Sequence, residues 1–319
     1  MHHQFFDFSC QIHTPAPPAG WPARVIWLVT PSLSDGFASL RNLVNWYLME
    51  ILYGLHPVEE ALRSGTRRFD HVCLAQERFK GGHDPRLAAI VTLCRSAGVK
   101  TRIEPRDALT RLAGTSAHQG IVAIVRERDF LGVEDLLTGA NPRLVLALDG
   151  VEDPQNLGAL LRTAEAAGVD GVLFTERRSA PLSAVAVQAS AGAAEHLRLA
   201  RVVNLVRALE ILKAHNLWIV GLDEHGAQDY DRYDFTSNTV IVLGREGAGL
   251  HDLVRRTCDH LLRIPMAGQV AALNVSAAGA VVLFEAARQR RPVRPSQPQA
   301  DAGRPAQGQK VKVRKGLGT

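Results

Sequence analysis

Two polar side chains, Asn274 and Ser276, stand where an apolar helix is expected to begin. They belong to the stretch 264–280, which reads I-P-M-A-G-Q-V-A-A-L-N-V-S-A-A-G-A. We predict that a short strand ends in Pro265 and that a glycine turn at Gly268 leads into the loop carrying both residues. The first backbone N–H groups of a helix lack partners within the helix, so a nearby side chain can cap them or meet a ligand. The stretch alone favours neither a capping asparagine nor a binding site.

Two further segments repeat this pattern of strand, turn and helix. The segment 239–250 reads T-V-I-V-L-G-R-E-G-A-G-L, an apolar strand followed by a glycine-rich turn that carries Glu246. The segment 146–163 reads L-A-L-D-G-V-E-D-P-Q-N-L-G-A-L-L-R-T, in which Asn156 and Arg162 lie six residues apart. All three segments therefore place polar side chains just beyond an apolar strand, where a parallel sheet collects its functional groups.

The glycine pattern of the second segment separates it from a dinucleotide-binding loop. Gly244, Gly247 and Gly249 follow G-x-x-G-x-G, whereas the dinucleotide fingerprint is G-x-G-x-x-G, and no other segment supplies that fingerprint. Glycines in such a turn let the backbone approach a ligand closely. The sequence thus predicts a ligand-binding turn but does not favour NAD.

Composition narrows the classes of protein that this chain can be. Its 319 residues predict two domains plus tails, and 46% hydrophobic residues are ample for a core. No apolar run is long enough to span a bilayer, so we expect no membrane partner. The 12 histidines show neither H-x-x-x-H nor H-E-x-x-H spacing, which predicts no metal. The net charge of +5 permits a polyanionic partner such as RNA.

The spacing of the four cysteines bears on the cellular compartment of the protein. They are scattered, with no C-x-x-C pair, at Cys10, Cys73, Cys94 and Cys258. Neither a disulfide framework nor a zinc site is indicated, so we expect a reducing, cytoplasmic location.

Hydrophobic periodicity divides the chain into an α/β amino-terminal part and a longer region of alternating strands and helices. The expected division is 1–48 extension, 49–126 first domain, 127–143 linker, 144–290 second domain and 291–319 tail. In the first domain we expect helices at 57–63, 85–97 and 107–112, and strands at 71–75, 100–103 and 121–125. In the second, expected strands lie at 144–148, 171–174, 217–221, 240–243 and 261–264. This alternation is what a parallel sheet covered on both faces requires.

Both chain ends differ from the middle. Residues 1–48 hold 8 of the 18 aromatic residues but only four Asp, Glu, Lys or Arg side chains. They lack the basic and apolar regions of a signal peptide. We favour Met49 as the true initiator, and a genuine but poorly packed extension is the alternative. Residues 291–319 are rich in Pro, Gln, Gly, Lys and Arg, so we expect disorder. The tail's charge either attracts RNA phosphates or only solubilises the protein.

In their order along the chain, the three strand–turn–helix segments resemble the three motifs of the SpoU (TrmH) family of RNA ribose 2′-O-methyltransferases. The resemblance covers about residues 49–290. It implies S-adenosylmethionine as cofactor and an α/β catalytic domain with a parallel sheet and a trefoil knot of the SPOUT type. True knots are rare, so this expectation rests on the resemblance alone. Family members pair through their last helix, which implies a homodimer built on the apolar run 277–287.

The amino-terminal segments extend the resemblance. G-L-H-P-V-E-E-A-L at 54–62 and H-Q-G-I-V-A at 118–123 resemble the small RNA-binding domain, similar to a ribosomal protein, of the family's ribosomal-RNA enzymes. The ending L-F-E-A-A-R-Q-R at 283–290 is similar to the same subgroup. RNA is therefore the expected partner, and a guanosine of 23S rRNA the expected target.

The implied reaction is in-line attack of a ribose 2′-hydroxyl on the sulfonium methyl group. That hydroxyl is a weak acid, so its proton must be removed or its developing charge stabilised. The family gives Arg162 a role at the ribose and phosphate. A guanidinium is a poor base, because its pKa exceeds 12, so we expect an electrostatic activator first and a base second. Six residues rotate a helix by a net angle of about 240°, so we expect Asn156 in the turn after Pro154 and Arg162 deeper on the site-facing side.

The remaining site residues follow from the same resemblance. Glu246 matches the glutamate that holds the site's hydrogen-bond network, and Asn274 matches the asparagine near the methyl group. With Asn156 and Arg162 they form the expected catalytic set. The expected cofactor-binding residues lie in the same loops and grip mainly through backbone groups: Gly244, Ile264 and Leu273, with Leu222 and Met266 as neighbours.

One position departs from the family. Ala272 stands where the family usually has the serine of Ser-Leu-Asn, whose hydroxyl is thought to orient the network. Its loss either slows the reaction or is offset by Ser276 or a water molecule. Ala272 also supports one alternative function, a noncatalytic RNA-binding or ribosome-assembly protein with a decayed site.

Two enzymatic alternatives share the fold and the motifs. A tRNA guanosine 2′-O-methyltransferase is the first, although such enzymes typically lack the amino-terminal domain. A resistance methyltransferase that acts on adenosine in ribosomal RNA is the second, and the sequence leaves it open.

Overall fold

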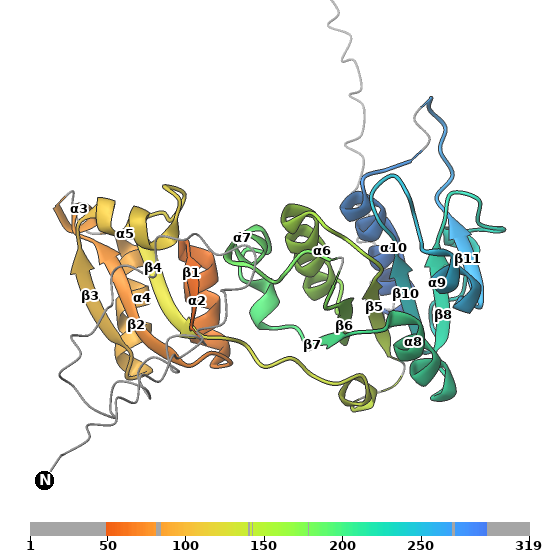
Figure 1. The fold of residues 1–319 in the computed structure, drawn as a ribbon, viewed down its shortest axis with the longest axis horizontal. Coiled ribbons are helices and arrows are strands. Elements are labelled where there is room, and N and C mark those ends of the chain that lie inside the picture. The colour runs from red at the N-terminus through yellow and green to blue at the C-terminus, as the bar shows by residue number, and fades with distance from the viewer. Residues whose placement is uncertain are drawn as a thin grey trace, which may run out of the picture.

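The computed structural model describes residues 49–291, except 81–83, 140, 142, 178, 270 and 271. The chain forms two sheets, each with its own helices, joined by one connecting segment (Figure 1). The aromatic extension over 1–48 and the basic tail lie outside the described residues, so the expectations for both ends stay predictions. Within the described part, no helix is both long and apolar enough to cross a membrane.

Residues 49–126, which we call the small unit, form a four-stranded sheet in the order β1-β4-β2-β3. Strand β4 pairs antiparallel with β1 and β2, and β3 adds parallel to β2. Its elements are β1 (Met49–Tyr53), α2 (Leu55–Ser64), β2 (Phe69–Ala75), α3 (Glu77–Lys80), α4 (Pro85–Ser96), β3 (Lys100–Glu104), α5 (Arg106–Ala113) and β4 (Ile121–Arg126). The expected strands and helices are present with bounds that differ by one or two residues, and β1 and the short helix α3 are elements that the sequence pattern did not predict.

Residues 144–290, the large unit, form a seven-stranded parallel sheet in the order β7-β6-β5-β10-β8-β11-β9. Its strands are β5 (Leu144–Leu148), β6 (Gly171–Thr175), β7 (Leu199–Val202), β8 (Trp218–Leu222), β9 (Gln228–Asp229), β10 (Thr239–Leu243) and β11 (His260–Arg263). Its helices are α6 (Pro154–Ala166), α7 (Ala184–Ala189), η3 (Ala193–Glu195), α8 (Leu205–Ala214), η4 (Tyr230–Arg232), α9 (Asp252–Thr257) and α10 (Val275–Arg290). The five strands expected here are present, and the parallel α/β fold is confirmed.

Helices cover both faces of this sheet, and the strand residues alternate between them. Leu144, Leu146 and Leu148 of β5 belong to the core that also contains the apolar side chains of α6 and α10. Val145 and Ala147 belong to the opposite core, which α8 and α9 complete. Successive side chains of a strand point to opposite faces, so a strand buried on both sides is apolar throughout. All five residues of β5 and of β10 are buried, which places these strands at the centre of the sheet.

The segment expected as a loosely helical linker packs against the large unit at several points along its length. Leu131 forms a parallel bridge with Ala200 beside β7, and the short helix η2 (Glu134–Leu137) buries Leu136 in the core under α8. Phe130 meets Phe174 edge to face with ring centroids 5.6 Å apart. The charged composition that indicated a linker therefore coexists with apolar anchors at short spacing.

Candidate active site

The candidate site forms where the carboxyl ends of β5, β10, β8 and β11 meet. Because these strands are parallel, the loops that follow them emerge at one edge of the sheet. Asp153 caps α6 by accepting a hydrogen bond from the Gln155 N–H at 3.0 Å, and Pro154 occupies the first helical position. Asn156 therefore lies in the first turn of α6. Our expectation that it sits in the turn before the helix is wrong, because the Asp-Pro pair starts the helix two residues earlier.

Hydrogen bonds join side chains from all three motifs. Asn156 Nδ2 donates to Glu246 Oε1 at 2.8 Å, and Asn274 Nδ2 donates to Asn156 Oδ1 at 3.1 Å. Asn274 Oδ1 in turn accepts from the backbone N–H of Ser276 at 2.9 Å and so caps α10. Capping and site assembly, which the sequence posed as alternatives, are thus two functions of one side chain.

The hydroxyl of Ser276 joins the same network. Its Oγ donates to Asn274 Oδ1 at 2.6 Å, so the backbone N–H and the hydroxyl of Ser276 both donate to that oxygen. The amide of Asn274 is thereby held with its Nδ2 toward Asn156. Ser276 thus bonds the amide of Asn274, while Ala272 lines the adjacent pocket, and whether Ser276 offsets the missing family serine stays a prediction.

A pocket of about 190 Å³ opens beside this network. It is lined by the carboxyl ends of β8 and β10, the glycine loop, the loop before α10 and the start of that helix. All five residues expected to bind the cofactor contribute to its wall, namely Leu222, Gly244, Ile264, Leu273 and Met266. Glu246, whose carboxylate accepts from Asn156, also lines it.

The glycines of the second motif are explained by the loop itself. Arg245 and Gly249 exchange backbone hydrogen bonds of 3.0 and 3.1 Å, which closes the loop tightly. A Cβ at Gly244 would lie 2.3 Å from the Gly249 carbonyl carbon, and Gly247 and Gly249 have φ of 71° and 65°. We expected these glycines to let a ligand approach; the structure assigns them first to the close return of the loop.

Arg162 lies apart from the network. It is exposed on α6, does not line the pocket, and makes no hydrogen bond or ion pair with any residue that the structure describes. Gly158, one turn before it, faces α7, where a Cβ would meet Ala189 Cβ at 2.4 Å. The rotation of about 240° between Asn156 and Arg162 thus separates the two on a regular helix. Within one chain the structure brings together Asn156, Glu246 and Asn274 but not Arg162.

Asp149, which the sequence motifs did not single out, links two of the loops that form the site. It follows β5 directly and is 4% exposed. Its Oδ2 accepts a hydrogen bond from the backbone N–H of His251 at 2.7 Å. Its Oδ1 lies 2.9 Å from His251 Nδ1. The first and second motif loops are tied together in this way. A charged residue immediately after a fully apolar strand, as in L-A-L-D-G, was the signal in the sequence.

Asp223 is a second such residue, on the loop after β8. Its carboxylate is buried at the pocket wall, pairs with Arg255 at 2.8 Å, and accepts the His225 N–H at 2.9 Å. The pair links the β8 loop to α9 beneath the pocket. Spacing along the chain gave no sign of it, since 32 residues separate the partners.

No group of three or more His, Cys, Asp or Glu side chains within the described ranges is arranged to hold a metal ion. Cys73, Cys94 and Cys258 are free thiols, and burial raises the pKa of Cys258 to about 12.

Comparison with known proteins gives a consistent result along the chain. Residues 143–284 match the profile of the SpoU rRNA Methylase family, and residues 51–131 match that of RNA 2′-O ribose methyltransferase substrate binding. The 23S rRNA (guanosine-2′-O-)-methyltransferase RlmB of Yersinia pestis is 42% identical over 248 residues, covering 76% of this chain and 98% of the relative. RlmB of Escherichia coli K12 is 41% identical over 248 residues, covering 76% and 100%.

Solved structures show the same fold. The SpoU methyltransferase AviRb from Streptomyces viridochromogenes, in complex with AdoMet, superposes with a TM-score of 0.65 at 24% identity, covering 81% of this chain and 95% of that one. The AdoMet-bound rRNA methyltransferase from Sinorhizobium meliloti gives a TM-score of 0.64 at 26% identity, covering 79% and 90%.

Proposed function

Because this chain belongs to the SpoU rRNA Methylase family, we propose that it transfers a methyl group from S-adenosylmethionine to the ribose 2′-hydroxyl of a guanosine in 23S rRNA. The observation that carries the proposal is the hydrogen-bonded series of Asn274, Asn156 and Glu246, whose last member lines the pocket. It brings all three family motifs to one point. The relatives that share both profiles across the chain support the guanosine target.

The pocket fits the cofactor by the chemistry of its wall. Leu222, Ile264, Leu273 and Met266 supply apolar surface for an adenine and a methionine chain, and the loop at Gly244 supplies backbone groups. Bound there, S-adenosylmethionine supplies an electrophilic methyl group. The AdoMet-bound relative from Sinorhizobium meliloti supports this assignment.

The protein's own contribution is orientation and charge. Glu246 holds Asn156 with one carboxylate oxygen, and Asn156 in turn holds Asn274 at the start of α10. These amides position the ribose hydroxyl for in-line attack. Arg162 supplies positive charge for the developing alkoxide and the neighbouring phosphate, and does not act as the principal base because a guanidinium stays protonated.

The finer architecture follows the family. The small unit is the RNA-binding domain, with a fold resembling a ribosomal protein. Helix α10 packs against α6, where a Cβ at Gly279 would meet Leu160 Cδ2 at 2.4 Å. The trefoil knot of this part of the chain is proposed from the family alone. Two chains pair through α10, on which Phe284 is 43% exposed, and each active site draws on both protomers. The protein requires no metal and works in the cytoplasm, where bacterial rRNA is made.

The decisive experiment maps 2′-O-methylated nucleotides in the rRNA of a deletion strain. One guanosine of 23S rRNA should lose its methyl group and regain it when the wild-type gene is restored. The Arg162→Ala variant should fail to restore it. Loss of methylation in tRNA, or at an rRNA adenosine, would contradict the proposed target.

Calorimetry with S-adenosylmethionine separates an enzyme from a noncatalytic assembly protein. The intact pocket should bind the cofactor, whereas a decayed site should not. A protein that binds no cofactor yet rescues ribosome assembly would overturn the enzymatic proposal.

A further inference from the structure

The small and large units are packed together over a buried surface. Helix α2 and strand β1 of the small unit contact α7 and η3 of the large unit. Gly192, with φ of 87°, lets the chain before η3 approach α2, because a Cβ there would lie 2.7 Å from Glu60 Cβ. A single apolar cluster contains both Val58 of α2 and Ala194 of η3. The two units therefore share one continuous core.

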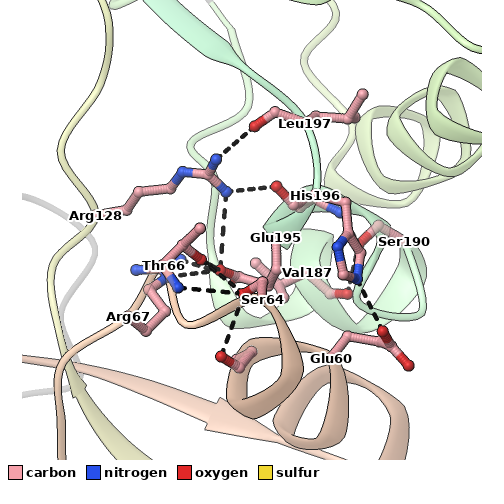
Figure 2. Close-up of polar contacts among 12 residues, drawn as sticks. Glu60, Ser64, Thr66, Arg67, Arg128, Val187, Ser190, Glu195, His196 and Leu197 are labelled. Carbon is pink, nitrogen blue, oxygen red and sulfur yellow. Dashed lines mark hydrogen bonds and ion pairs between the residues drawn. The ribbon is translucent and has the colours of Figure 1, made fainter.

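A buried ion pair lies at the centre of this junction (Figure 2). Arg67 of the small unit donates to both carboxylate oxygens of Glu195 in η3, at 2.9 and 3.1 Å. The side chain of Arg67 is 1% exposed and that of Glu195 0%. Arg67 also donates to Glu50 at 2.6 Å, and the Thr66 hydroxyl donates to Glu195 at 3.2 Å. Each of the three guanidinium nitrogens of Arg67 thus donates a hydrogen bond.

The connecting segment adds a second arginine to the junction. Arg128 donates to the backbone carbonyls of Ala194 and Leu197, and its guanidinium lies 3.8 Å from the Glu195 carboxylate. The connecting segment contacts the large unit first through Arg128 and again, three residues later, through the bridge of Leu131 with Ala200. A segment held at both points leaves the small unit little freedom to swing.

A buried, two-pronged pair favours one orientation over others. Desolvating two charges is costly, and only a geometry that satisfies both groups offsets that cost. Rotating the small unit would separate Arg67 from Glu195 and leave each charge buried without its partner. The rim pair of His196 with Glu60, 2.8 Å apart and partly exposed, lacks this sensitivity because water can replace either partner.

The junction connects directly to the helix that carries the reaction. Glu195 lies in η3, which together with α7 packs against α6. At Gly158 the contact between α6 and α7 is close enough that a Cβ would lie 2.5 Å from the Ala186 carbonyl oxygen. Asn156 lies two residues before that glycine and Arg162 four residues after it.

We propose that Arg67 and Glu195 are positioning residues for RNA methylation: their buried pair fixes the small unit against α6 in one orientation, so that RNA held by the small unit presents its ribose at the pocket. The inference rests on the proposed function. It assigns a role in substrate placement to two residues that contact neither cofactor nor RNA.

The test replaces Glu195 by glutamine, which keeps the shape and removes the charge. Three quantities are compared with wild type: hydrogen exchange in α2, η3 and α8, steady-state methylation of 23S rRNA, and S-adenosylmethionine affinity by calorimetry. Glu195→Gln should raise exchange in α2 and η3 but not in α8. It should lower kcat/KM for rRNA by about 10-fold or more, since loss of orientation carries such factors. Cofactor affinity should stay within about twofold, because no residue of α6, α7 or η3 lines the pocket.

Two further variants sharpen the result. Arg67→Lys keeps the charge but loses the two-pronged geometry, so its kcat/KM should lie between those of wild type and Glu195→Gln. Hydrogen exchange in α8 reports whether Glu195→Gln folds. If it does not fold, Arg67→Lys tests the proposal in its place. Lys213→Met removes a partly exposed pair with Asp259 on the far side of the large unit and should match wild type.

The outcomes separate this inference from the function on which it rests. Wild-type protein that does not methylate rRNA would overturn the proposed function. Active wild type with an unchanged kcat/KM in Glu195→Gln would overturn only the positioning role. Cofactor affinity that falls in parallel with methylation would show that the pair merely supports the fold.

Discussion

Arg162 combines an exposed position with the charge that the proposed reaction needs. In one chain it contacts neither the pocket nor the Asn156–Glu246 pair. Replacing Arg162 by alanine should therefore leave S-adenosylmethionine affinity unchanged and cut methyl transfer by roughly 100-fold or more, as for other charges aligned with a transition state. Calorimetry and single-turnover methylation measure the two effects separately.

The matched variant is Asn274→Ala, which removes a side chain that caps α10 and bonds Asn156. It should weaken both cofactor binding and methyl transfer. If Arg162→Ala abolished cofactor binding instead, the place of the arginine beside the ribose would be wrong.

Ala272 can be examined by restoring the serine that the family usually carries. Because Ser276 Oγ already donates to Asn274 Oδ1 at 2.6 Å, we expect Ala272→Ser to change the methylation rate less than about twofold. Steady-state rates of the two proteins decide the point. A clear gain in rate would mean that the natural site is impaired.

His118 makes the stability of the small unit dependent on pH. Burial first, and Arg106 second, lower the pKa of His118 from its ordinary value of 6.5. Its Nδ1 accepts the Gly120 N–H at 3.1 Å, and its Nε2 meets Thr110 Oγ1 at 3.0 Å. The unfolded chain thus binds a proton that the folded chain resists. The free energy of unfolding should fall as pH drops below about 6.5.

Urea denaturation between pH 7 and pH 5 measures this dependence, with His118→Asn as the comparison. The variant should be less stable at pH 7 but lose less stability on acidification. Equal slopes in the two proteins would contradict the role of His118.

At the scale of elements, the contact of α6 with α7 depends on the absence of a side chain at Gly158. A Cβ there would lie 2.4 Å from Ala189 Cβ and 2.5 Å from the Ala186 carbonyl oxygen. Gly158→Ala should lower the free energy of unfolding by about 1–3 kcal/mol, because overpacking outweighs the gain in helix propensity. Gly268→Ala, where an added Cβ meets nothing within 4 Å, is the control and should be neutral in the same denaturation experiment.

At the scale of the whole molecule, the exposed side chain of Phe284 on α10 supports a dimer. Phe284 is 43% exposed on a helix otherwise packed against α6. Light scattering at micromolar concentration should give about twice the chain mass of 34.7 kDa. Phe284→Glu should shift the protein toward monomer, whereas Val203→Glu, at an apolar residue 76% exposed elsewhere, should not. A wild-type monomer would contradict the proposed interface.

The amino terminus is tested by a chain that begins at Met49. Met49 is the first residue of β1 and pairs in register with Arg126 of β4, so the described fold begins at this residue. The shortened protein should keep its melting temperature and its methylation activity. A large drop in melting temperature would show that residues 1–48 pack on the fold.

The sequence by itself determined the strand–turn–helix segments and the parallel sheet, because both depend on short-range patterns. The run Leu144–Leu148 is apolar at every position, as a strand buried on both faces must be, and the structure has those bounds. The five residues expected at the cofactor lie at the end of a strand or in the loops that follow strands, and all five line the pocket. They were expected from the resemblance of the motifs to the family, and their contact with the cofactor stays a prediction.

Tertiary structure alone decided how distant residues pair. Asp149 with His251, Asp223 with Arg255, and Arg67 with Glu195 are each separated by tens to more than a hundred residues along the chain. No local period relates such partners, since strand and helix periods describe neighbours within one element. Whether Asn156 and Arg162 meet was likewise decided by where α6 begins, because a helix that contains both residues separates their directions by a net angle of about 240°.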